Sequence, residues 1–243
     1  NGFIPNNLTN TLLMNDIKKV FITHSDVAYS NIYIQKYHKY FFKIVTVNEY
    51  TKDKLKTLLD IEDNKIDKII NYTNIKYDKI INLEKNKKFG IITRFSEDKN
   101  VIMLLFSLKK FFKIYNDYEF YLVGYENEHI QKYILYIIKY LKLDNYIKVE
   151  GYQNNVKKYY ELFDFIILPS VSEGTSYNLI ESMIYKKLIV ASDVGGNKEL
   201  LNNHCIYIDY NGIKQFEMDN IYIEDYQQQL NLLGYYNITD YND

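Results

Sequence analysis

The sequence of 243 residues contains one cysteine, two prolines and no tryptophan. A single cysteine, Cys205, excludes a disulfide framework and a multi-cysteine zinc site, and we therefore expect a reducing, cytoplasmic location. No stretch reaches about 18 consecutive uncharged apolar residues, and no charged-then-apolar leader opens the chain, so we predict neither a membrane-spanning helix nor a signal peptide. The chain begins at Asn1 instead of methionine, which suggests a piece of a longer protein.

An excess of charge of one sign is also absent. The chain has 30 basic and 31 acidic residues, which leaves a formal net charge of -1. A strongly basic surface is therefore not expected, and we predict no nucleic-acid partner. Apolar residues make up 47% of the chain and charged residues 25%, which is typical of a globular protein with one large domain or two small ones.

Arginine is the scarcest of the common charged residues, because Arg94 is the single arginine among the 30 basic residues. The 27 tyrosines, in a chain rich in lysine, asparagine and isoleucine, indicate a compositional bias and need no functional explanation. Lysine can replace arginine where charge alone matters, but it cannot provide a planar, bidentate fork. Arg94 is therefore a candidate for a role beyond charge.

Short apolar runs alternate with helical segments in the later part of the chain. The runs predict strands at 89–93, 119–123, 146–149, 164–168, 188–191 and 205–208. The intervening patterns predict helices at 100–115, 128–142, 154–163, 176–186 and 197–202. Six strands alternating with five helices indicate an open, parallel α/β sheet with right-handed crossovers.

The earlier part of the chain repeats this alternation over a shorter length. It has predicted strands at 19–23, 42–47 and 67–70, predicted helices at 27–40 and 50–60, and a lysine- and asparagine-rich linker at 76–88. We therefore expect two domains, 1–83 and 84–243. The first has too few strands for an independent doubly wound domain, which fits truncation at its N-terminus. A further helix is predicted at 222–233.

Glycines gather at the predicted strands of the later domain. Six of the nine lie within or just beyond these strands, at positions 90, 124, 151, 174, 195 and 196. In a parallel sheet the ligand crevice lies outside the carboxyl ends of the strands, where glycine lets backbone amides approach a ligand. The dinucleotide fingerprint G-x-G-x-x-G and the phosphate loop G-x-x-x-x-G-K-[ST] are both absent. We therefore expect a nucleotide-type site that is neither that of a nicotinamide dehydrogenase nor that of a P-loop ATPase.

The segment 168–183 carries the most chemical information. It is predicted to form strand, turn and helix, with Glu173 and Gly174 in the turn and Glu181 on the helix. A helix N-terminus presents unpaired amides to an anion, so a diphosphate fits over residues 174–178. The two carboxylates on either side of that position suit recognition of sugar hydroxyls.

The surroundings of this segment resemble the retaining GT-B glycosyltransferases of family 4, the glycosyl transferases group 1. The resemblance covers residues 88–203, and the segments that carry it are 90–100, 120–124, 149–151, 164–170, 173–174, 180–181 and 191–200. It implies an α/β fold of GT-B type. The Rossmann-like parallel sheet of 84–243 is then the C-terminal domain that binds the nucleotide sugar, and 1–83 is the end of a second, Rossmann-like N-terminal domain on the acceptor side.

The resemblance also implies roles for individual residues. In that family the two glutamates of an E-x7-E motif bind the donor, which places Glu173 at the sugar and Glu181 at the ribose. Basic residues after the first strand of the C-terminal domain hold the diphosphate, and here these match Arg94 and Lys99. The turn and helix start after the first glutamate are expected to contact the donor as well, through Gly174, Thr175, Ser176, Tyr177 and Asn178.

Two further matches concern the base and the sugar. The loop after the third strand holds the base in that family, which places Gly151 and Tyr152 beside it. The strand that ends at His24 matches one whose histidine lies near the donor sugar. The resemblance is looser in this earlier part, since the turn at 71–74 lacks the usual proline and glycine, and the glycine-rich acceptor loop of a complete enzyme is not found.

The implied reaction moves a sugar from a nucleotide-diphosphate sugar to a hydroxyl of a glycan, lipid or protein acceptor, with retention of configuration and no cofactor. Catalysis is assigned to Glu173, Arg94, Lys99 and His24. No D-x-D motif occurs, so no metal site is predicted, and Arg94, Lys99 and helix amides are expected to neutralise the leaving group. The alternatives are a non-catalytic nucleotide-sugar-binding module, and a nucleotide-sugar epimerase or glycogen-phosphorylase-like enzyme of the same architecture. The apolar helix at 101–115 fits peripheral membrane association less well than a core-facing position.

Overall fold

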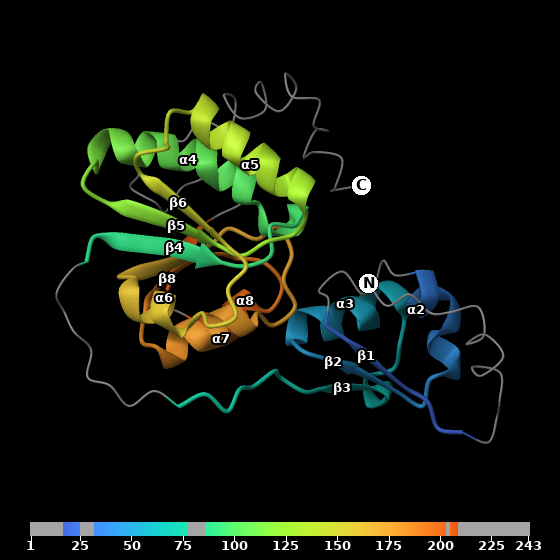
Figure 1. The fold of residues 1–243 in the computed structure, drawn as a ribbon. Helices are drawn as coiled ribbons and strands as arrows, with labels where there is room; N and C mark the ends of the chain where they lie inside the picture. Colours follow the sequence, from blue (N-terminus) through green and yellow to red (C-terminus); the bar gives the residue numbers. More distant parts are fainter. Residues whose placement is uncertain (1–16, 25–31, 77–85, 203–204, 209–243) are drawn as a thin grey trace. The chain divides into compact units, whose positions relative to one another are not determined.

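The computed structural model describes residues 17–24, 32–76, 86–202 and 205–208 (Figure 1). Its contacts divide the chain into two units. The first contains the described residues of 1–75, 172–181 and 194–203, and the second contains the described residues of 76–171, 182–193 and 204–243. The predicted boundary between residues 83 and 84 and the predicted helix at 222–233 lie outside the described residues.

The second unit is built on a parallel sheet of six strands. These are β4 (Lys88–Ile92), β5 (Glu119–Val123), β6 (Ile147–Gly151), β7 (Phe165–Leu168), β8 (Leu188–Ser192) and β9 (Ile206–Ile208). Their order across the sheet is β6-β5-β4-β7-β8-β9, and every pair of neighbours is parallel. The predicted parallel α/β sheet is confirmed, with each strand boundary within two residues of its predicted position.

Five α-helices follow the strands of the sheet, as the alternating pattern predicts. They are α4 (Val101–Ile114), α5 (Glu128–Tyr140), α6 (Lys157–Leu162), α7 (Tyr177–Ile184) and α8 (Asn197–Leu201). A short 3₁₀ turn, η4 (Glu97–Lys99), precedes α4 and was not predicted. Helix α5 begins at a side-chain cap, in which the side chain of Asn127 accepts a hydrogen bond from the amide of Ile130 at 3.0 Å.

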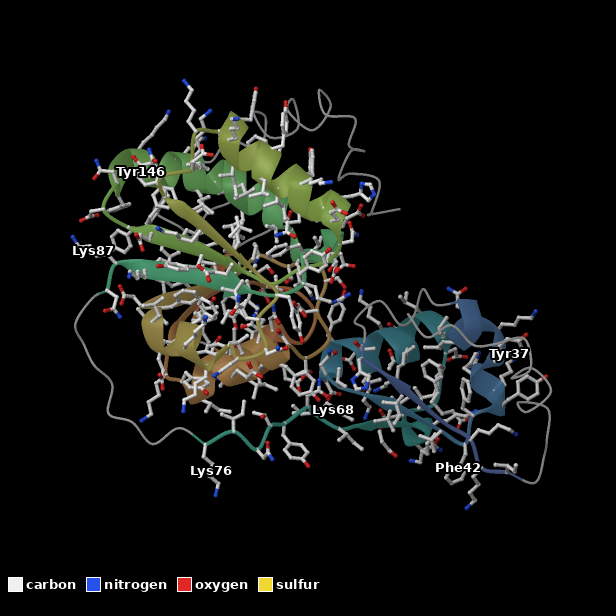
Figure 2. All side chains as sticks on the ribbon, in the orientation of Figure 1. Tyr37, Phe42, Lys68, Lys76, Lys87 and Tyr146 are labelled. Carbon is white, nitrogen blue, oxygen red and sulfur yellow. The ribbon has the colours of Figure 1, made fainter. Side chains whose placement is uncertain are left out.

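The core of the second unit lies between the sheet and helices α4 and α5, where side chains fill the space (Figure 2). Phe89 on β4 is fully buried and stacks on Phe165 of β7, with ring centroids 4.4 Å apart. Helix α4 turns one apolar face inward, so Leu105 and Phe112 are buried against the sheet. Burial of one such side chain stabilises the fold by about 1.5–3 kcal/mol. The core-facing position predicted for this helix is confirmed.

The described residues up to 75 form a part of the first unit that contains a smaller parallel sheet and two α-helices. Its strands are β1 (Val20–Thr23), β2 (Lys43–Thr46) and β3 (Ile66–Lys68), in the order β1-β2-β3, and its helices are α2 (Ile32–Tyr37) and α3 (Glu49–Leu59). Short 3₁₀ turns occur at His38–Tyr40 (η2) and Asp63–Lys65 (η3). The core consists of Ile34, Phe41, Ile44, Leu55, Ile61 and Ile66. The start of the helix predicted at 27–40 lies outside the described residues.

Local features determine where helix α3 begins and where it ends. The Oδ1 atom of Asn48 accepts a hydrogen bond from the amide of Thr51 at 2.7 Å, which caps the first turn. The helix ends at Asp60, whose left-handed backbone, with φ of 51°, stops the helical repeat. Because α3 begins at Glu49, its first amides lie shortly after β2, which ends at Thr46. Within the described part of the chain, every helix is too short or too polar to cross a bilayer.

Candidate functional site

The topology of the six-stranded sheet locates a candidate site in the second unit. Strands β4 and β7 are neighbours, and the chain proceeds from β4 to β5 and β6 on one side and from β7 to β8 and β9 on the other. Ligands of open parallel sheets bind outside the carboxyl ends of the strands at such a reversal of strand order. The segments that directly follow β4 and β7 are therefore the candidate site of this unit.

Arg94 lies in the segment that follows β4. Its side chain is 67% exposed, and its Nη1 atom lies 3.9 Å from Oε2 of Glu126, which follows the neighbouring strand β5. A contact of this length and exposure contributes little to folding. The guanidinium is therefore accessible to a ligand, and Glu126 adds a nearby negative charge that sequence reasoning did not identify.

Lys99 lies further along the same segment, in the turn η4. Its side chain is 15% exposed, and its Nζ atom lies 3.0 Å from Oδ2 of Asp98. Burial raises the pKa of Asp98, but the nearby Ser96 hydroxyl and the Lys99 ammonium outweigh it and hold the pKa below its ordinary value. Asp98 is therefore charged at neutral pH beside Lys99.

Two hydrogen bonds join the segments after β4 and β7. The amide of Val171 donates to the carbonyl of Asp98 at 2.8 Å, and the side-chain amide of Asn100 donates to the carbonyl of Pro169 at 3.2 Å. These bonds connect the turn that carries Lys99 with the first residues beyond β7. The two loops at the strand-order reversal thus form one hydrogen-bonded structure.

Gly151 and Tyr152, predicted to lie beside a base, are at the same edge of the sheet. The carbonyl of Gly151 accepts a hydrogen bond from the amide of Gly124 at 2.8 Å, at the carboxyl ends of β6 and β5. Tyr152 follows directly and is 73% exposed. A tyrosine at this position can offer its ring face to a planar ligand group.

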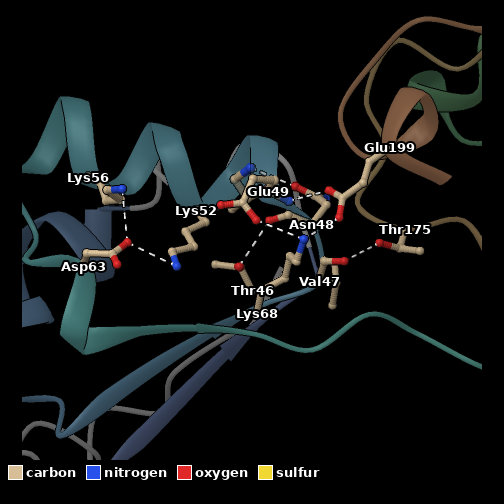
Figure 3. A network of polar contacts seen from close by, with 11 residues as sticks. Thr46, Val47, Asn48, Glu49, Lys52, Lys56, Asp63, Lys68, Thr175 and Glu199 are labelled. Atoms are coloured by element: carbon tan, nitrogen blue, oxygen red, sulfur yellow. Dashed lines mark hydrogen bonds and ion pairs between the residues drawn. The ribbon is translucent and has the colours of Figure 1, made fainter. Parts of the chain in front are cut away.

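The turn at 173–176 belongs to the first unit. Glu173 and Thr175 are buried, at 8% and 7% exposure. The Oγ1 atom of Thr175 donates to the carbonyl of Val47 at 2.6 Å (Figure 3). The side-chain amide of Asn71 donates to the carbonyl of Thr175 at 3.0 Å. The turn is therefore fixed by residues that lie more than one hundred positions earlier in the chain.

Glycine at position 174 permits a close approach between the turn and His24, the residue that follows β1. A Cβ atom built on Gly174 would collide with the carbonyl oxygen of His24 and lie 3.2 Å from Cγ2 of Val47. Only glycine fits this approach without a backbone shift. The structure thus brings His24, at the end of β1, beside the turn that carries Glu173. The side chain of His24 is exposed.

Glu181 lies on α7, which begins at Tyr177. The amide of Ile180 donates to the carbonyl of Ser176 at 3.2 Å, so Ser176 and Tyr177 form the first turn of this helix. Glu181 is half-buried, whereas Tyr177 is exposed. The first unit therefore brings together these predicted site residues: His24, Glu173, Gly174, Thr175, Ser176, Tyr177, Asn178 and Glu181. The second unit holds the others, which are Arg94, Lys99, Gly151 and Tyr152.

Sequence reasoning missed Lys68, Glu49 and Glu199, which form a polar cluster in the first unit. Glu199 lies in a segment that carries the family resemblance, but no local pattern marks it as a partner of Lys68. Among the residues that the structure describes, no three His, Cys, Asp or Glu side chains are grouped to hold a metal ion.

The strand order and the parallel pairing of every neighbouring strand define an open, parallel α/β class of protein. Residues 86–217 match the family model of the glycosyl transferases group 1, and the chain belongs to this family. A glycogen synthase from Aliivibrio fischeri (strain ATCC 700601 / ES114) is 32% identical over 117 residues, which are 48% of this chain and 23% of that protein. The matched region thus spans about a quarter of the length of the curated relatives.

Two solved structures are similar over most of the chain. A variant of S. aureus TarM, in complex with Fondaparinux, alpha-GlcNAc-glycerol and UDP, matches with a TM-score of 0.72 and 20% identity, over 85% of this chain and 44% of that one. Anabaena HepE, in complex with UDP and glucose, matches with a TM-score of 0.67 and 16% identity, over 82% and 59%. These similarities confirm the predicted α/β fold of GT-B type.

Proposed function

We propose that this chain is part of a glycosyltransferase that takes a sugar from a nucleotide-diphosphate sugar and transfers it to an acceptor hydroxyl with retention of configuration. The observation that carries the proposal is the position of two glutamates at the start of α7. Glu173 is buried in the turn before the helix, and Glu181 lies about one turn into the helix. Membership of the glycosyl transferases group 1 and the UDP in the TarM and HepE structures support it.

Each part of the donor has a proposed partner. Glu173 accepts hydrogen bonds from sugar hydroxyls, with His24 nearby, and Glu181 accepts them from the ribose, because an ionised carboxylate can accept from two neighbouring hydroxyls. Gly151 and Tyr152 contact the base. The remaining contacts come from Gly174, Thr175, Ser176, Tyr177 and Asn178.

The chemical step requires stabilisation of the leaving nucleoside diphosphate. Negative charge grows on its phosphate oxygen as the bond to the anomeric carbon breaks, while the acceptor hydroxyl attacks from the same face. Arg94, Lys99 and amides at the start of α7 supply positive potential, so the proposed reaction needs no metal ion and no cofactor. The acceptor is a hydroxyl of a glycan, a lipid or a protein, and the proposed location is the cytoplasm.

A non-catalytic nucleotide-sugar-binding module is the second candidate, because the segments that match the family lie mainly on the donor side. One experiment separates the two. UDP-, GDP- and ADP-sugars are titrated into the chain with EDTA present, and the anomeric signal of released sugar is followed by NMR. Binding together with release of sugar from the donor supports the enzyme, and binding without release supports the module. Failure of all three nucleotides to bind contradicts both.

A further inference from the structure

A cluster of three charged side chains in the first unit lies outside the residues assigned to the donor. The Nζ atom of Lys68, at the end of β3, lies 2.7 Å from Oε1 of Glu199 and 2.9 Å from Oε2 of Glu49. The other oxygen of Glu199, Oε2, accepts a hydrogen bond from the amide of Glu49 at 2.6 Å (Figure 3). One oxygen of Glu199 is therefore held by Lys68 at the end of β3, and the other by the first amide of α3.

The electrostatics of this arrangement favour its formation. The carboxylate of Glu199 lies at the first amide of α3, where the helix dipole is positive. The hydrogen bond with Glu199 is the main cause of the raised pKa of Lys68, and the hydrogen bond with Lys68 is the main cause of the lowered pKa of Glu49. The side chains of Lys68 and Glu199 are 30% and 28% exposed. Solvent therefore screens the attraction between their charges less than it screens a fully exposed ion pair.

Glu199 is connected to the turn of Glu173 through its own helix. Helix α8 begins after Gly196, whose amide donates to the carbonyl of Gly174 at 3.0 Å and to that of Glu173 at 3.4 Å. A Cβ atom on Gly196 would collide with the Gly174 carbonyl and lie 2.9 Å from Cβ of Asn48. The start of α8 is therefore packed between the turn and the residue that caps α3.

We propose that Lys68 and Glu199 are positioning residues, which hold α8, and through the Gly196 amide the turn that carries Glu173, in the geometry that binds the donor sugar. This inference rests on the proposed function for its ligand. The two residues touch no donor atom in this account. They act through α8 and α3. Their substitution is therefore expected to loosen the turn, while the residues assigned to the donor are unchanged.

A double-mutant cycle on the 243-residue chain tests the coupling. Its variants are Lys68→Met, Glu199→Gln and the double substitution, and the first readout is hydrogen exchange of the Gly196 amide, measured by NMR without ligand. Each single substitution is expected to speed exchange about two- to fivefold. The double variant should exceed the faster single variant by little, because both remove the same interaction.

Two further variants serve as controls. Lys43→Met removes an ion pair with Asp67 on the same sheet, at 2.9 Å and with the lysine equally 30% exposed, and it should leave exchange at Gly196 unchanged. Lys68→Arg keeps the positive charge and should retain the parental exchange rate. Additive effects in the cycle, or an equal effect of Lys43→Met, would overturn the inference, as would parental exchange in both single variants.

A second readout separates positioning from general loss of stability. Because Glu173 is assigned to the sugar, Glu199→Gln should raise the Kd of UDP-glucose by a larger factor than the Kd of UDP. Equal factors for the two ligands, with the melting temperature unchanged, would overturn the positioning role. If the parent chain binds neither ligand, the proposed function fails, and the exchange experiment alone then decides whether Lys68 and Glu199 hold the turn.

Discussion

Replacement of the single arginine by lysine should weaken donor binding without weakening the fold. The guanidinium of Arg94 is 67% exposed, and its ion pair with Glu126 is 3.9 Å long. Exposed pairs contribute up to about 1 kcal/mol to folding, and the ammonium of lysine keeps the charge. The free energy of unfolding of Arg94→Lys should therefore lie within about 0.5 kcal/mol of the parent.

The expected effect on binding is much larger. A guanidinium donates two parallel hydrogen bonds to a phosphate, whereas an ammonium acts as a point charge. Loss of one hydrogen bond to a charged group costs about 1.5–3 kcal/mol. At about 1.4 kcal/mol for each tenfold change, the Kd of UDP should rise by roughly 10- to 100-fold.

Isothermal titration with UDP measures this change, and urea unfolding provides the stability control. Lys132→Gln is a matched variant, since Lys132 is 72% exposed and forms an ion pair with Glu128 on α5, which we do not assign to the site. It should leave the Kd unchanged. An Arg94→Lys variant that binds UDP within about twofold of the parent would mean that Arg94 supplies only charge or lies outside the site.

Other substitutions test separate parts of the account. Glu181→Gln should weaken UDP binding while the melting temperature stays within a few degrees of the parent, because a half-buried helix carboxylate adds little stability; equal affinity by titration would assign Glu181 to the surface. Phe89→Ala should lower the free energy of unfolding by about 3–5 kcal/mol in urea titrations, since the ring is fully buried among aromatic neighbours, and a loss below about 1 kcal/mol would contradict that packing. The lowered pKa of Asp98 contributes stability that is present above the unfolded pKa of about 3.9 and is lost as pH falls through the folded value. Asp98→Asn should therefore lose less stability than the parent between pH 5 and pH 2 in thermal unfolding scans, and parallel profiles would refute this assignment.

The strands were predictable because each is a short apolar run in a buried parallel sheet. Phe165–Leu168 is an example, since it is a four-residue apolar run whose last three residues are buried. A run of this length is typical of a buried strand and is too short for a typical helix. The turn η4 was missed because three polar residues, Glu97–Lys99, give no periodic signal. The hydrogen bonds from Val171 to Asp98 and from Asn100 to Pro169 join this turn to residues after β7, and local sequence does not predict such contacts.

The candidate site was predictable only in part. The turn at Glu173 and Gly174 was found from its position between a strand and a helix start. The contact between Lys68 and Glu199 joins residues 131 positions apart, and no spacing rule predicts such a pair. For the same reason the sequence did not indicate that 172–181 and 194–202 pack with the first unit. The assignments of Glu173, Glu181, Arg94 and Lys99 to the donor stay predictions.

The most direct test of the proposed donor site is an NMR titration of the isotopically labelled chain with UDP in EDTA, in which the amide shifts report where the nucleotide binds. The account predicts that the largest changes occur at the start of α7, over residues 174–178, and at Gly151 and Tyr152, with saturation at the same UDP concentration for both segments. Saturable shifts confined to other parts of the chain, or binding that appears only after addition of Mn²⁺, would contradict it.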